Sequence, residues 1–161
     1  MTEEQQVELE ELAPQPALSI RATIRVAQLG DTMGERIRVL SQLLRERGAK
    51  PAGPPFVRYH TFGKTETDME LGVPVTEPTA GVGQVVGGEL PGGPAVTTWH
   101  LGAHDRLGEA YGRMERWRTE HGREPAGPGW EVYHWIDLAS GEDSSPADPS
   151  TWRVQLVQPI K

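Results

Sequence analysis

Apolar and polar positions alternate most clearly between residues 130 and 137. Four Pro and Gly residues among positions 125–129 interrupt whatever precedes this run. The run itself is rich in aromatic and β-branched residues, which predicts a strand. Successive side chains of a strand point to opposite faces. The mainly apolar set, expected to pack on helices, is Trp130, Val132, His134 and Ile136. The other face carries Glu131, Tyr133, Trp135 and Asp137.

Helical periodicity predicts two helices, one in each half of the chain. In the first, Asp31 is a suitable N-cap, apolar residues follow at helical spacing, and Gly48 suits the C-terminal cap. In the second, Asp105 and Gly122 take the same positions. The helices are expected over residues 32–47 and 106–121. Strands are expected over residues 7–12, 17–26, 56–62, 68–75, 84–90, 94–101, 129–138 and 151–158.

The two halves of the chain repeat one another. At an offset of 74, residues 31–60 match residues 105–134, and the shared sequence includes Pro-Ala-Gly-Pro and Tyr-His. Upstream the offset becomes 78, and the two blocks together hold 16 identities in 45 aligned positions. We therefore expect a single domain over residues 1–161, built from duplicated half-modules at about 6–75 and 84–161. With one helix for each four strands, the expected fold is α+β, an antiparallel sheet with both helices on one face and a ligand cleft on the other.

Glu131 breaks the repeat, because its counterpart in the first half is Val57. A carboxylate beside large aromatic residues can be a solvated strand residue, a counter-ion for a cationic ligand, or a base that activates water. Trp99 replaces Arg21 of the first half and could stack on a flat ligand or hold a cation. Tyr59 and Tyr133 match each other, so they either face one cleft or simply complete the sheet.

Composition excludes several classes of function. A formal net charge of -7 over 161 residues argues against a nucleic-acid surface. The absence of cysteine excludes thiol catalysis and Cys-ligated zinc. The sequence contains neither an apolar run near 18 residues nor a secretory signal. We expect a cytoplasmic protein that requires no cofactor or metal and contacts neither nucleic acid nor membrane directly; its oligomeric state is left open.

Motifs along most of the chain resemble the GyrI-like family of effector-binding domains. They are VELEELAPQPALSIRATI, VRYHTFGKTETDMELGVPV, WHLGAHDRLGEAYGRMERW, HGREPAGPGWEVYHW and RVQLVQPI. The resemblance implies a duplicated strand–helix–strand–strand module that binds lipophilic, often cationic or planar compounds between its halves. The acidic residue that the family carries on a late strand corresponds to Glu131. One branch of the family is similar to hydrolases that open the cyclopropane of DNA-alkylating natural products with an aromatic cage.

Three functions follow from the sequence and the resemblance. The first is a stand-alone receptor for a hydrophobic or aromatic small molecule, giving sequestration, sensing or drug resistance. The second is a cyclopropane-opening hydrolase, with Glu131 positioning water and Trp99 holding the substrate. The third is a modulator of a protein partner such as gyrase. In the first two, the expected site lies on the helix-free face and is lined by Tyr59, Trp99, Glu131, Tyr133 and Trp135.

Overall fold

The computed structural model describes residues 6–102, 106–134, 136 and 152–161. The expected elements are present, with ends shifted by a few residues. They are β1 (Glu8–Leu12), β2 (Gln15–Arg25), a short 3₁₀ turn (Val26–Gln28), α1 (Leu29–Arg47), β3 (Phe56–Phe62), β4 (Glu66–Pro74), β5 (Val86–Leu90), β6 (Gly93–Leu101), α2 (Leu107–Glu120), β7 (Trp130–Tyr133) and β8 (Arg153–Pro159). Asp105 and Trp135 lie outside the described residues. Within the described ranges, no helix is long and apolar enough to cross a membrane.

All eight strands form one sheet in the order β1-β6-β8-β7-β3-β4-β2-β5. Every pairing in it is antiparallel. The order reads the same in reverse when each strand is exchanged with its counterpart in the other half, β1 with β5 and β3 with β7. Such symmetry is what a duplicated module requires, although the duplication itself stays a hypothesis. The α+β antiparallel class is confirmed.

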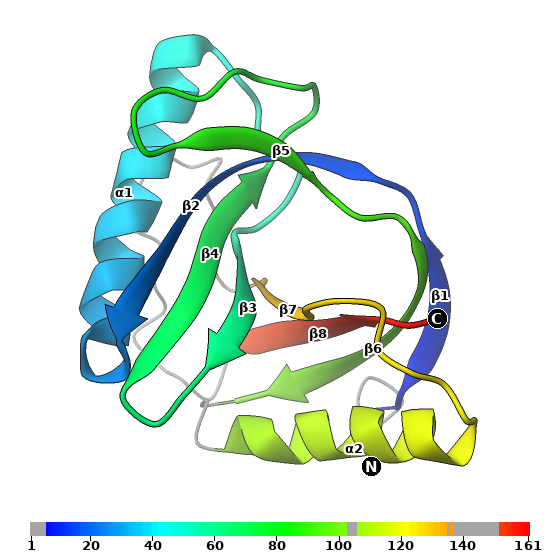
Figure 1. The fold of residues 1–161 in the computed structure, drawn as a ribbon. Helices are drawn as coiled ribbons and strands as arrows, with labels where there is room; N and C mark the ends of the chain where they lie inside the picture. The colour runs from blue at the N-terminus through cyan, green and yellow to red at the C-terminus, as the bar shows by residue number, and fades with distance from the viewer. Residues whose placement is uncertain (1–5, 103–105, 135, 137–151) are drawn as a thin grey trace.

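Both helices pack on the same face of the sheet. The sheet curves strongly, and α1 and α2 lie on its outer side, α1 along β2 and β4 and α2 along β6 (Figure 1). A single apolar core joins the two helices to the sheet, and Leu18, Leu40, Val57, Leu71 and Leu156 are fully buried in it. A smaller core, which includes Phe56 and Trp130, lies on the opposite face. The centre of the sheet is therefore buried on both sides.

The ends of α1 agree only in part with the expected caps. Asp31 is not its N-cap: the helix begins at Leu29, after Gln28, with no side-chain cap hydrogen bond. The 3₁₀ turn Val26–Gln28 instead leads directly from β2 into the helix, so the first helical turn lies earlier than the polar pattern suggested. Gly48 does cap the C-terminus, with φ 64° and its N–H donated to the carbonyl of Arg45.

The expected faces of β3 and β7 are wrong. Cross-strand pairing places Ile20, Leu71, Val57, Glu131, Leu156 and Thr98 in one row across six strands. Because directly paired residues share a face, Glu131 lies on the helix-covered side with Val57. Tyr59 and Tyr133 share that side, while Arg58 lies on the other, with its guanidinium 5.8 Å from the Trp130 ring centre.

Candidate functional site

The Glu131 carboxylate is buried in the middle of the sheet. Its residue is 4% exposed and lies on β7, between β3 and β8. Two phenol groups donate hydrogen bonds to it: Tyr133 to Oε1 at 2.7 Å, and Tyr111 of α2 to Oε2. The strand supplies the acid and one tyrosine, and the helix above supplies the second donor. Packing of α2 on the sheet is what brings these groups together.

A third tyrosine extends the network. The Tyr59 hydroxyl on β3 forms a hydrogen bond with the Tyr133 hydroxyl. His100, which is 6% exposed on β6, stabilises the negative charge of Glu131 electrostatically. We call Glu131, Tyr59, Tyr111 and Tyr133 the Glu131 cage. One carboxylate thus lies among three aromatic rings drawn from three separate elements.

Electrostatics in the cage are dominated by burial. Burial raises the pKa of Glu131, and the hydrogen bonds from Tyr111 and Tyr133 and the nearby His100 only partly oppose this. Burial and the Glu131 charge also raise the pKa of each of the three tyrosines, so all three remain protonated donors. Within the described part of the chain, no Lys or Arg side chain forms an ion pair with Glu131. The described hydrogen-bond donors to the carboxylate are phenols and not cations.

Tyr111 connects the buried carboxylate to the protein surface. The residue is 40% exposed, yet its hydroxyl reaches the buried Glu131. The helical pattern indicated only an apolar position at Tyr111 and did not predict this hydrogen bond. A signal was available, since the matching residue at the offset of 74 is Ile37.

The first half of the chain is apolar at the positions where the second half forms the cage. Val57 pairs directly with Glu131 across β3 and β7 and is fully buried. Ile37 takes the place of Tyr111 and packs against the main core. On the helix-covered face of the sheet, polar groups from the second half of the chain therefore lie next to aliphatic groups from the first half.

Trp99 lies on the other face of the sheet, away from the cage. It pairs with Gln155 in the row that includes Val132, and its ring centre is 4.6 Å from that of His134. Arg153 places its guanidinium 4.7 Å from the Trp99 ring centre. The expectation that Trp99 and Glu131 line one cleft is wrong, because β6 and β7, which flank β8, carry them on opposite faces of the sheet. His134, expected on the helix side, is also on this face.

The sequence profile of the GyrI-like small molecule binding domain matches residues 5–139. The chain belongs to the GyrI-like family. The EcmrR C-terminal domain superposes with a TM-score of 0.75 at 21% identity, covering 97% of each chain. In its complex with DNA, EcmrR superposes with a TM-score of 0.80 at 20% identity, and the match spans 97% of this chain and 57% of EcmrR.

Two further structures share this GyrI-like fold. SAV2435, bound to tetraphenylphosphonium, superposes with a TM-score of 0.63 at 11% identity, covering 97% of this chain and 94% of that one. A hydrolase from Listeria innocua superposes with a TM-score of 0.65 at 10% identity, covering 98% and 93%. At such identities the likeness shows the fold alone. No curated protein sequence matches the chain significantly.

Proposed function

We propose that this GyrI-like domain is a receptor for lipophilic organic cations and that Glu131 is their counter-ion. The observation that carries the proposal is a buried carboxylate that accepts hydrogen bonds from two tyrosines and forms no ion pair with a Lys or Arg among the described residues. An isolated carboxylate in such a place is costly unless a positive charge joins it. A cationic ligand that pairs with Glu131 offsets the cost of burying its carboxylate, and this gain favours binding.

The surroundings favour lipophilic cations over small hydrated ones. Tyrosine faces attract organic cations through their ring quadrupole, with about 0.5–2 kcal/mol per contact. A strongly hydrated metal ion or ammonium would lose its water shell on entry, whereas a cation whose charge is shielded by carbon loses little. Val57 and Ile37, from the first half of the chain, offer apolar contacts on the same face of the sheet as Glu131. Charge and apolar area together set the ligand class.

Tetraphenylphosphonium is the probe of choice. SAV2435, which shares the fold, is bound to that ion in its structure. Tetraphenylborate has the same shape and size with the opposite charge, so it is a matched control ligand. Isothermal titration calorimetry should show tetraphenylphosphonium binding and little or no tetraphenylborate binding. Equal affinity for the two ions would contradict the proposal, because shape alone would then explain the binding.

A matched pair of variants tests the counter-ion. Glu131→Gln should weaken tetraphenylphosphonium by about 10- to 100-fold, as expected for loss of a desolvated charge partner. Glu70→Gln is the control, because Glu70 lies on the opposite face and is bound to His60 at 2.9 Å and Ser19 at 2.6 Å. It should leave the affinity unchanged. If both variants weaken binding equally, the acid acts through net charge and not as a local partner.

A second candidate is a hydrolase that opens an electrophilic cyclopropane, as one branch of the family resemblance implies. The raised pKa of Glu131 supports it, since a buried carboxyl group that keeps its proton to higher pH can act as a general acid as well as a base. Water would add across the broken carbon–carbon bond, with the oxygen on one carbon and its proton, relayed by Glu131, on the other. Mass spectrometry of a cyclopropane-bearing compound after incubation would then show the mass of one added water. If the compound binds and its mass stays unchanged, the hydrolase is excluded for that compound and only the receptor function is supported.

A further inference from the structure

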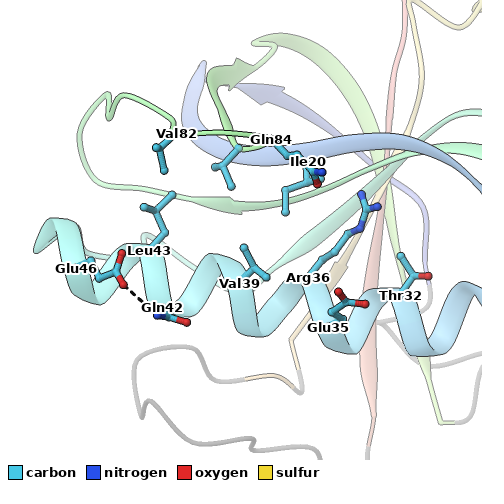
Figure 2. Close-up of a pocket in the computed structure, with 11 residues that line it drawn as sticks. Ile20, Thr32, Glu35, Arg36, Val39, Gln42, Leu43, Glu46, Val82 and Gln84 are labelled. Carbon is cyan, nitrogen blue, oxygen red and sulfur yellow. Dashed lines mark hydrogen bonds between the residues drawn. The ribbon is translucent and has the colours of Figure 1, made fainter.

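A second concave surface lies far from the Glu131 cage, between α1 and the segment that leads into β5 (Figure 2). It has a volume of about 420 Å³, within the range of small-molecule sites. Its lining consists of Ile20, Thr32, Glu35, Arg36, Val39, Gln42, Leu43, Glu46, Val82, Gln84 and Val85. We call it the α1–β5 groove. Ile20 is on β2, three strand steps from β7 or about 14 Å at usual strand spacing.

The floor of the groove is apolar. Ile20 and Leu43 are 4% and 6% exposed and form its base. Val39 of α1 and Val82 of the opposite segment are 45% and 54% exposed at its sides. Their exposed surface is apolar area that a ligand could cover. The groove is suited to an apolar body of modest size.

Arg36 is the cation among the groove residues. In Figure 2 its side chain extends from α1 toward the strands, while the carboxylates of Glu35 and Glu46 stay close to the helix. Glu46 accepts a hydrogen bond from Gln42 at 3.0 Å. Within the described residues, the Arg36 guanidinium has no hydrogen-bond or ion-pair partner. A fork of five donors beside aliphatic walls is suited to a carboxylate or sulfonate.

We propose that the α1–β5 groove binds small organic anions that carry a carboxylate or sulfonate on an apolar body. Arg36 pairs with the anionic head, and Val39, Leu43 and Val82 cover the apolar part. The preference for negative charge is opposite to that of the Glu131 cage. The two sites can therefore be loaded separately, and this proposal does not depend on the first.

The test uses two fluorescent probes with one skeleton. 1-Anilinonaphthalene-8-sulfonate is the anion, and N-phenyl-1-naphthylamine is the same molecule without its sulfonate. Arg36→Gln should weaken the sulfonate probe about tenfold and leave the neutral probe unchanged, since only the charge-assisted contact is lost. Arg38→Gln is the matched control, because Arg38 is an exposed arginine on the same helix outside the groove. It should change neither affinity.

Three results would overturn the proposal. The first is a sulfonate affinity that Arg36→Gln does not lower, or lowers no more than that of the neutral probe. The second is displacement of the sulfonate probe by tetraphenylphosphonium, which would place both in the Glu131 cage. The third is loss of probe binding as protein concentration rises together with a dimer in sedimentation velocity. That would mean that a second copy of the chain covers the exposed valines.

Discussion

Glu131→Gln should stabilise the protein at neutral pH while it weakens cation binding. The variant keeps the size of the side chain, and its amide can still accept a hydrogen bond from one tyrosine and donate one to the other. It discards only the charge that burial disfavours. Function and stability should therefore move in opposite directions at this one residue.

The size of the effect follows from proton linkage. Burial holds the folded-state pKa of Glu131 above its unfolded value, so between the two values the native state keeps a proton that the unfolded state has released. The free energy of unfolding of the natural protein therefore falls as pH rises through this window, by up to about 1.4 kcal/mol per pH unit. Above the folded-state pKa the loss is complete and stays constant. Below the pKa of Glu131 in the unfolded state, no stability is lost.

Urea unfolding at half-unit steps from pH 4 to pH 9 measures this directly. The difference in free energy of unfolding between Glu131→Gln and the natural protein should grow with pH and then level off. Glu115→Gln, an exposed acid on α2, should show no such growth. A difference that is constant with pH, or that shrinks as pH rises, would refute the burial argument. Saturating tetraphenylphosphonium should abolish the growth, since the cation stabilises the charged form.

Three further outcomes follow from the geometry. Tyr111→Phe removes a donor to Glu131, so the rise of tetraphenylphosphonium affinity with pH should move to higher pH in calorimetry; an unmoved profile would argue against that bond. Gly72→Ala should cost about 1–3 kcal/mol in urea unfolding, because its new methyl group would clash with the Phe56 ring and lie 2.9 Å from the Leu18 carbonyl oxygen, whereas Gly34→Ala on α1 has open space and should gain up to about 1 kcal/mol. Burial alone would raise the pKa of Glu70, but hydrogen bonds from Ser19 and His60 hold it below its usual value, so its stabilisation should be full above the unfolded pKa and disappear as pH falls through the folded one. Replacing it with Gln should flatten that acid limb of the stability curve, and an unchanged limb would contradict the assignment.

The sequence by itself determined the order and type of the elements. Period-2 alternation in β2 puts Leu18 and Ile20 on one face of the strand, and both are buried in the main core. Helical spacing and Gly48 located α1 and its end. These features are local, since a strand or helix pattern is written in consecutive residues and needs no distant partner to be recognised. The singular position of Glu131 was also visible, because the repeat offers Val57 for comparison.

Only the tertiary structure decided which face of the sheet Glu131 occupies. At its centre the curved sheet buries both faces: Phe56 is 1% exposed on one side and Val57 0% on the other. Alternation of apolar and polar residues distinguishes a buried face of a strand from a solvent-exposed one. It cannot assign the two faces where both are buried. The large aromatic Trp130 suggested the helix side, yet it belongs to the smaller core on the opposite face.

The partners of Glu131 depended on packing for the same reason. Tyr111 reaches the carboxylate because α2 crosses the sheet there, 20 positions away in sequence from the acid. Trp99 is separated from the acid by the thickness of the sheet, although its strand is only two steps from β7 in the strand order. Residue type showed that an acid and several aromatics were available. Which of them meet was fixed by strand pairing and by the helix laid across one face.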